Sequence, residues 1–185
     1  MKASSDLLLL DVNVLLALAW PNHQFHTAAT QRLESSRERW ATCALTQLGF
    51  IRISSNPAAV ATAKTPAEAA RLLAAMVRDP LHVYLRSLRA PSDGRSIRVF
   101  ERVLGSKQVT DAYLISLARQ HKAKLMTFDA RLKAATRSGE EIELVAGRVG
   151  VPMDFANEAE RPKPCIIFPV GVVPLKPCLD TVGRI

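Results

Sequence analysis

The chain has 185 residues, which fits one domain because domains commonly run to roughly 100–200 residues. Its composition of 48% hydrophobic and 23% charged residues is close to the globular average and excludes wholesale disorder and collagen-like repeats. Lys and Arg outnumber Asp and Glu by 25 to 17, so the net charge of +8 favours a polyanionic partner such as RNA or DNA, whereas 5% aromatic residues argue against a base-stacking platform.

Short apolar runs alternate with helical patterns along most of the chain. In order, we predict a strand at Leu7–Leu10, a helix at Val12–Ala19, a helix at Phe25–Arg37, a strand at Trp40–Cys43, a helix at Leu45–Ile53, a helix at Pro66–Val77, a strand at Leu81–Leu85, a helix at Ile97–Leu104, a helix at Asp111–His121, a strand at Lys124–Thr127 and a strand at Ile142–Val145. Thr65 and Glu68 form a capping-box pattern, and Thr110 is the expected N-cap of the helix that follows it. Strands separated by helices predict an α/β fold with a mainly parallel sheet covered on both faces.

The sequence changes character near residue 146. Six of the 11 prolines fall after this point, so we predict a folded domain over residues 1–146 and a Pro-rich tail over 147–185 that is partly docked or irregular. The tail has five basic and four acidic residues, which leaves +7 of the charge in the domain. Within the tail, Cys165–Val173 is apolar enough to dock as an edge strand, since Pro169 excludes a central one.

The cysteines and the N-terminus favour a cytoplasmic protein. Cys43, Cys165 and Cys178 are too few for a disulfide framework, and none forms the C-x-x-C pair of a zinc ribbon. The apolar run Leu7–Leu10 is far shorter than the roughly 20 residues that cross a bilayer, and no signal-peptide cleavage pattern follows it.

Acidic residues fall where a parallel sheet would carry a site. Asp11 follows the first strand, Asp129 follows the strand Lys124–Thr127, and Asp111 lies in the first turn of a helix. Ligands of open parallel sheets bind beyond the carboxyl ends of the strands, so we expect the three to meet at one rim. Their charges would repel without cations, which indicates Mg²⁺ or Mn²⁺ with oxygen ligands. Each acid taken alone is more typical of a turn or a helix cap.

Four blocks in order resemble the motifs of PIN domains, and most of all those of VapC-like toxin ribonucleases of bacterial toxin–antitoxin pairs. They are Leu9–Asn13, Thr46–Arg52, Val109–Leu114 and Leu125–Asp129. The resemblance covers about residues 6–146, and the tail matches nothing in it. It implies a three-layer α/β/α sandwich, a metal-dependent endoribonuclease using Mg²⁺ or Mn²⁺, an RNA substrate, a cognate antitoxin protein and a homodimer.

The resemblance also implies roles for particular residues. Asp11, Asp111 and Asp129 match the metal-binding, catalytic acids of the family, and Asn13 and Thr127 match the polar residues that support them.

Gln47 departs from the family, which usually has a Glu at this position. A Gln keeps an acceptor oxygen but loses a negative charge, which would weaken cation binding. Asp93 or Glu101 could replace it as a ligand, although both are more typical of surface residues. The alternative for Gln47 is an exposed helical residue without a role.

Basic and histidine residues supply further candidates. Arg52, Lys107, Arg131 and Lys133, with Arg137 beside them, are candidates for RNA binding, and the alternative for each is a solvated helical face. His23 and His26 could share a helical face as ligands but are more typical of a helix start, and His82 is expected to be a half-buried strand residue.

Three other functions stay open: a PIN-like binding module without catalysis, a DNA-directed nuclease, and a housekeeping RNA-processing nuclease without an antitoxin. An antitoxin could lay an amphipathic helix in a groove between the early helices and direct an Arg toward the acids. The apolar residues Leu72, Leu73 and Met76 are expected to be core, with a dimer interface as the alternative.

Overall fold

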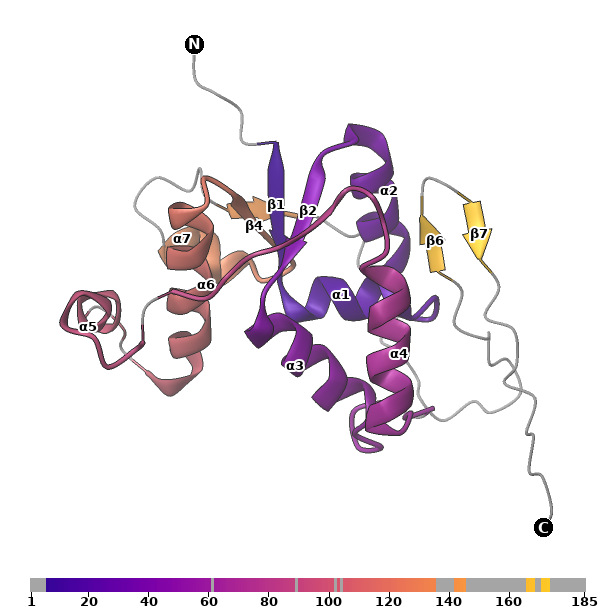
Figure 1. Ribbon diagram of the computed structural model, residues 1–185, viewed down its shortest axis with the longest axis horizontal. Helices are drawn as coiled ribbons and strands as arrows, with labels where there is room; N and C mark the ends of the chain where they lie inside the picture. The colour runs from indigo at the N-terminus through magenta and orange to yellow at the C-terminus, as the bar shows by residue number, and fades with distance from the viewer. Residues whose placement is uncertain are drawn as a thin grey trace.

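The computed structural model describes residues 6–60, 62–88, 90–101, 103, 105–135, 142–145, 166–168 and 171–173. In chain order the elements are β1 (Leu7–Leu10), α1 (Val12–Ala19), α2 (His26–Ser36), β2 (Arg39–Thr42), α3 (Ala44–Ser54), α4 (Pro66–Met76), β3 (His82–Tyr84), α5 (Gly94–Phe100), the 3-10 turn η1 (Ser106–Gln108), α6 (Val109–Gln120), β4 (Lys124–Thr127), α7 (Ala130–Ala135), β5 (Ile142–Leu144), β6 (Ile166–Phe168) and β7 (Gly171–Val173) (Figure 1).

The central sheet is wholly parallel, with the strand order β3-β2-β1-β4-β5. Strand β1 lies at its centre, where Leu9 pairs with Ala41 of β2 and with Leu125 of β4. From β1 the chain adds β2 and β3 on one side and then returns to add β4 and β5 on the other. The strand order therefore reverses between β1 and β4, the position at which open α/β sheets bind their ligands.

Two hydrophobic clusters cover the two faces of the sheet. Leu8 and Leu10 of β1 pack into a cluster with buried residues of α1, α2, α3 and α4, whereas Leu7 and Leu9 pack into a second cluster with α6 and Leu132 of α7. Successive side chains of a strand point to opposite faces, so a run of four leucines serves both clusters. Figure 1 shows α1, α3 and α4 on one side of the sheet and α6 and α7 on the other. The predicted three-layer α/β/α sandwich is confirmed.

The start of α4 follows the predicted capping box. The Thr65 hydroxyl accepts from the Glu68 amide at 3.3 Å, and the Glu68 carboxylate accepts from the Thr65 amide at 2.8 Å. The expected core residues of this helix, Leu72, Leu73 and Met76, are at most 4% exposed, so they are not an interface of the folded chain. No helix in the described part of the chain is long and apolar enough to cross a membrane.

Two helix starts differ from the prediction. Helix α5 begins at Gly94, three residues before the expected start at Ile97. The Asp93 carbonyl already accepts hydrogen bonds from the amides of Ser96 at 2.8 Å and Ile97 at 3.0 Å, which close the first helical turn. Thr110 is not an N-cap: η1 runs directly into α6, so Gln108 precedes the first helical residue and Thr110 lies inside the first turn.

The apolar stretch of the tail does not extend the central sheet. Strands β6 and β7 pair with each other in an antiparallel hairpin, with Ile167 opposite Val172, and β6 contacts α1 and α2. The expected edge strand at Cys165–Val173 is therefore wrong for the central sheet, since its described residues pair with each other. The remainder of the predicted tail, 147–165, 169–170 and 174–185, lies outside the described residues, as do Cys165 and Cys178.

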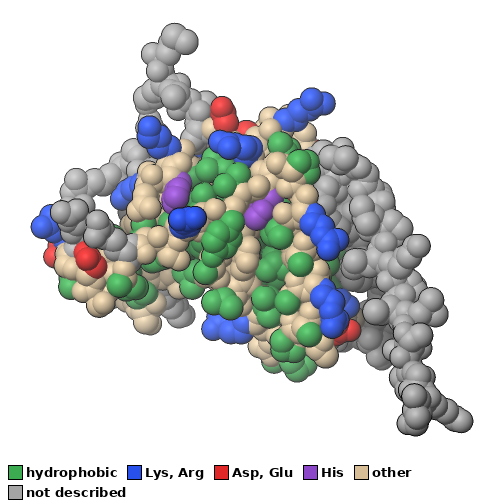
Figure 2. Space-filling model, viewed as in Figure 1, with side chains coloured by type: hydrophobic (Ala, Val, Ile, Leu, Met, Phe, Trp, Pro, Cys, Tyr) green, Lys and Arg blue, Asp and Glu red, His purple; other side chains and the backbone are tan. Residues whose placement is uncertain are grey.

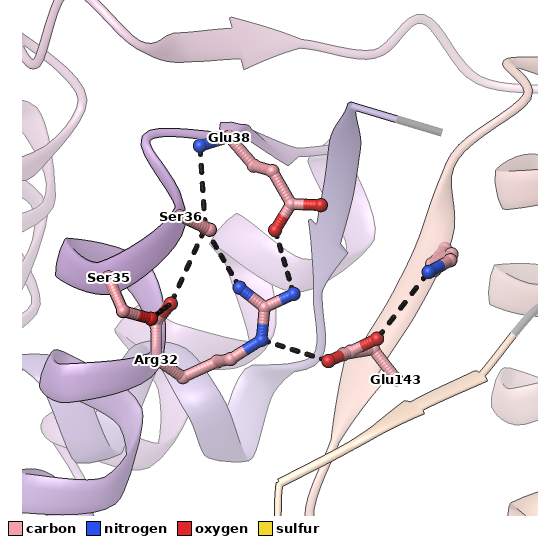
Figure 3. Close-up of polar contacts among 6 residues, drawn as sticks. Arg32, Ser35, Ser36, Glu38 and Glu143 are labelled. Atoms are coloured by element: carbon pink, nitrogen blue, oxygen red, sulfur yellow. Dashed lines mark hydrogen bonds and ion pairs between the residues drawn. The ribbon is translucent and has the colours of Figure 1, made fainter. Parts of the chain in front are cut away.

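A polar cluster ties α2 to both halves of the sheet (Figure 3). Arg32 of α2 binds Glu143 of β5, with its Nε 2.8 Å from Oε1, and binds Glu38 before β2, with its Nη2 2.7 Å from Oε2. Lys124 of β4 lies 3.7 Å from the other oxygen of Glu143. One guanidinium thus joins segments separated by 111 residues of sequence.

Candidate functional site

Asp11 lies at the centre of the carboxyl edge of the sheet, where β1 gives way to α1. Its backbone amide continues the sheet by donating to the Met126 carbonyl of β4 at 3.0 Å. Its side chain is the N-cap of α1, since Oδ1 accepts from the Val12 amide at 2.6 Å. The second oxygen, Oδ2, accepts from the Thr127 hydroxyl at 3.0 Å. One oxygen is therefore oriented by the start of α1 and the other by the neighbouring strand β4.

Asp129 follows β4 beside it and is oriented by the same threonine. Thr127 is fully buried, and its Oγ1 accepts from the Asp129 amide at 3.2 Å while donating to Asp11. The Asp129 carboxylate in turn accepts from the Arg131 amide at 2.9 Å, the hydrogen bond of a helix cap at the start of α7. It also receives the Arg131 guanidinium, with Nε 2.9 Å from Oδ1 and 3.1 Å from Oδ2.

Asp111 approaches the same edge from α6. It lies in the first turn of that helix and is half-buried. Burial raises the pKa of its carboxyl, and the charges of Asp11 and Asp129 raise that pKa further. The three acids predicted to share one rim thus act on one another electrostatically.

The pKa values of the three carboxyls are shifted in different directions by their surroundings. Burial raises the pKa of Asp11, with a smaller contribution from Asp129, against the hydrogen bonds from Thr127 and Val12 that lower it. For Asp129 the hydrogen bond from Arg131 dominates and lowers the pKa. Asp11 and Asp111 are therefore held in surroundings that penalise their negative charge, whereas Asp129 has its own cation.

The donor set fits a hard divalent cation in its chemistry, because all three side chains offer carboxylate oxygens. A cation beside them would offset the negative charge of Asp11 and Asp111, whose pKa values are raised mainly by burial and further by neighbouring carboxylates. No group of three or more His, Cys, Asp or Glu side chains in the described ranges is arranged as a complete metal site. The Asp129 carboxylate is instead bound to the Arg131 guanidinium.

Gln47 of α3 is neither fully exposed nor without a partner. It is half-buried, and its Nε2 donates to Thr42 Oγ1, at the end of β2, at 2.9 Å. Thr42 is fully buried and also bonds His82 Nε2 of β3 at 2.8 Å. The amide therefore belongs to a polar chain from the carboxyl end of β2 to the first residue of β3, which excludes the exposed, unbonded Gln.

The other candidates take varied places. Asn13 is exposed in the first turn of α1, and Glu101 is exposed while Asp93 is half-buried beside the start of α5. His26 Nδ1 bonds the Ala17 carbonyl at 2.7 Å, and His23 accepts from the Phe25 amide at 3.2 Å, so both act in the turn before α2, as expected of helix-start residues. His82 is half-buried in β3, as predicted.

Of the basic candidates, Arg131 is beside the acids and Arg52 is not. Arg52 is exposed in the last turn of α3, eight residues from the start of that helix and so about 12 Å along its axis. Lys107 lies in η1 and Lys133 in α7, and Arg137 falls outside the described residues. The face displayed in Figure 2 has Lys and Arg side chains spread among hydrophobic ones, with acidic side chains near its margins.

Two contacts of the site were not foreseen from the sequence. The pairing of Arg131 with Asp129 has a signal, a basic residue two positions after an Asp that caps a helix. The partner of Gln47 has none, because Thr42 reads as an ordinary strand residue.

Comparison with known proteins agrees with the motif order. The family model of the PIN domain matches residues 8–137. Ribonuclease VapC39 of Mycobacterium tuberculosis (strain H37Rv) is 40% identical over 132 residues, which are 71% of this chain and 94% of that relative. Ribonuclease VapC38 of the same strain is 39% identical over 66% of this chain and 84% of its own length, and Ribonuclease VapC44 is 40% identical over 65% and 84%. With the fold, the motif order and these matches in agreement, the chain belongs to the PIN-domain family and is a VapC-like member of it.

Proposed function

We propose that this chain is a metal-dependent endoribonuclease that hydrolyses RNA phosphodiester bonds as the toxin of a toxin–antitoxin pair. The observation that carries the proposal is the convergence of Asp11 and Asp129 on the Thr127 hydroxyl at the β1–β4 switch, with Asp111 in the first turn of α6 close enough to be affected by their charges. The relatives named ribonuclease VapC support the same activity.

In this mechanism Asp11, Asp111 and Asp129 would hold Mg²⁺ or Mn²⁺. A divalent cation at a phosphodiester lowers the pKa of water and offsets charge on the reacting phosphate. Thr127 fixes the direction of the Asp11 carboxylate through its hydroxyl at 3.0 Å, and the Val12 amide holds the other oxygen. With each oxygen held by one hydrogen bond, the Asp11 carboxylate presents its remaining lone pairs in a fixed direction, and one of them could accept a proton from water.

The domain outside this acidic site supplies the attraction for RNA. The chain carries +8 overall, of which the first 146 residues account for +7. Arg131 lies directly at the acids, and Arg52, Lys107 and Lys133 extend the basic candidates along α3, η1 and α7. Phosphate contacts of this kind make binding weaken as salt rises.

A toxin of this class needs a partner that masks the site in the cytoplasm. The partner is a cognate antitoxin protein, and an Arg of that protein directed at the three carboxylates would neutralise them. The protein itself is proposed to be a homodimer. Leu48 of α3, 65% exposed, and Tyr84 at the end of β3, 50% exposed, are apolar side chains available for such contacts.

The test is cleavage of a structured RNA with Mg²⁺ or Mn²⁺, with EDTA, and beside a DNA of the same sequence. Wild type is expected to cut the RNA only with metal, and Asp11→Asn is expected to lose cleavage. Glu34→Gln, which removes one charge from an exposed position of α2, is the matched control and should keep activity. Cleavage of DNA in preference to RNA, or full activity of Asp11→Asn, would contradict the proposal.

A second candidate is a PIN-like RNA-binding module with weakened catalysis, and Gln47 is the observation that favours it. Its amide donates to Thr42 where a Glu would bring a negative charge to the edge of the sheet. Gln47→Glu should bind Mn²⁺ more tightly and cleave faster if this side chain faces the ions. Equal Mn²⁺ affinity in the two proteins would place residue 47 outside the ion site.

A further inference from the structure

Arg131 holds Asp129 by two independent contacts. Its backbone amide donates to Asp129 Oδ1 at 2.9 Å, and its guanidinium reaches both carboxylate oxygens through Nε and Nη2. A carboxylate bound by a guanidinium at both oxygens has little freedom to turn toward other partners. Among the described residues, no guanidinium binds Asp11 or Asp111 in this way, and burial raises the pKa of both.

The ion pair between the Arg131 guanidinium and the Asp129 carboxylate is open to solvent on the arginine side. The Arg131 side chain is 87% exposed, whereas that of Asp129 is 25% exposed. An ion pair open to solvent on the arginine side is weak and is screened by salt, so a competing divalent cation can displace it. The helix cap from the Arg131 amide does not depend on the guanidinium, so α7 keeps its start when the side chain leaves.

We propose that Arg131 is a positioning residue that acts as a resident counter-ion of the site, holding Asp129 away from Asp11 and Asp111 until a divalent cation displaces its guanidinium. The inference rests on the proposed metal-dependent function. The cation and the guanidinium compete for the same carboxylate, so Arg131 lowers the affinity of the empty site for metal. The displaced guanidinium remains close to the site, since Arg131 is only two residues from Asp129. There it can donate two parallel hydrogen bonds to a phosphate group, as it does to the carboxylate.

Removing the guanidinium should therefore strengthen metal binding. A unit positive charge about 5 Å from a divalent cation, in surroundings close to water and screened by salt, changes affinity by roughly three- to ten-fold. Arg131→Gln removes both the charge and the two-point contact. Arg131→Lys keeps the charge but replaces the planar two-point contact by a single ammonium, so its affinity should lie between those of Arg131→Gln and wild type.

The experiment is a titration with Mn²⁺ alone, followed by calorimetry and by the electron paramagnetic resonance signal of free Mn²⁺, on the full chain without RNA. Arg71→Gln, which removes the same charge from an exposed position of α4, is the control and should stay within two-fold of wild type. Tighter binding confined to Arg131→Gln, with Arg131→Lys intermediate, supports the inference.

Two outcomes would overturn it, and they are distinguishable. If wild type binds Mn²⁺ and Arg131→Gln binds it equally or more weakly, the counter-ion role is wrong while the metal site stands. If wild type, Arg131→Gln and Asp11→Asn all fail to bind Mn²⁺, the proposed metal-dependent function fails and the inference fails with it.

Discussion

A substitution at Gly49 tests how closely α3 must approach the start of α1. A Cβ added at Gly49 would lie 2.7 Å from Val12 Cγ2, 3.4 Å from Cγ1 and 3.6 Å from Cβ. Val12 is the first residue of α1 and follows Asp11 directly, so its displacement would reach the candidate site. Turning the Val12 side chain offers little relief, because a β-branched residue in a helix has one strongly preferred rotamer and its second methyl is already near.

The magnitude follows from two opposing effects. Overpacking of this kind costs about 1–3 kcal/mol, whereas replacing Gly by Ala within a helix gains about 1 kcal/mol. Gly49→Ala should therefore destabilise the wild type by about 0–2 kcal/mol. In a Val12→Ala background both methyls are gone, so the same substitution should stabilise the protein by about 1 kcal/mol.

The measurement is a double-mutant cycle by urea unfolding, followed by the fluorescence of Trp20 and Trp40, which are 6% and 2% exposed. The expected coupling between the two positions is about 1–3 kcal/mol. If Gly49→Ala changes the free energy of unfolding equally in both backgrounds, the close contact does not limit this helix pair and the reasoning is refuted.

Two further predictions concern hydrogen bonds described above. Thr127→Val should lower the free energy of unfolding by about 1–3 kcal/mol and weaken Mn²⁺ binding, because it removes the donor to Asp11 and the acceptor of the Asp129 amide. Thr127→Ser keeps the hydroxyl and should stay near wild type in both measurements. Unchanged Mn²⁺ affinity in the valine variant would show that this hydroxyl does not orient the acids. Burial raises the pKa of Glu38, but the hydrogen bonds with Arg32 and Ser36 and the charge of Arg32 together outweigh it, so the folded-state pKa lies below its ordinary value. Glu38 therefore contributes stability at neutral pH that is lost as the pH falls through that lowered pKa. Glu38→Gln should make the melting temperature fall less steeply below about pH 4.5. An equally steep fall of the melting temperature in the variant would count against this ion pair.

The sequence predicts those parts of the fold that depend on local pattern. The four leucines of β1 and the Thr65–Glu68 capping box behave as their residue types indicate, because burial and capping are written in adjacent residues. Helix α5 begins early because Asp93, inside a Pro-Ser-Asp-Gly stretch typical of a loop, starts a helix instead. The hairpin of β6 and β7 was missed since a short apolar run does not state its partner.

At the site, the positions of the acids followed from topology but their partners did not. Placing Asp11 and Asp129 after neighbouring parallel strands required only the order of strands and helices. The contact between Arg131 and Asp129 has a local signal, a basic residue two positions after a capping Asp, but its formation depends on the rotamers of both side chains. The contact of Gln47 with the Thr42 hydroxyl has no such signal.

The helix-cap interpretation and the metal-site interpretation of Asp11 are both compatible with the structure, and substitutions can separate them. Asp11 caps α1, yet its charge is penalised by burial and by Asp129. Asparagine caps a helix about as well as aspartate, and its amide can donate to the Thr127 hydroxyl, so Asp11→Asn keeps the cap and removes the charge. In EDTA the free energy of unfolding of Asp11→Asn should be at least that of wild type. Asp11→Ala loses the helix cap, so its free energy of unfolding should be lower by about 1 kcal/mol. If both variants lose Mn²⁺ binding while only the alanine variant loses stability, the carboxylate charge serves the ion and the hydrogen bond serves the fold. Equal loss of stability in the two variants would show instead that the charge itself stabilises the metal-free protein, against the direction of its raised pKa.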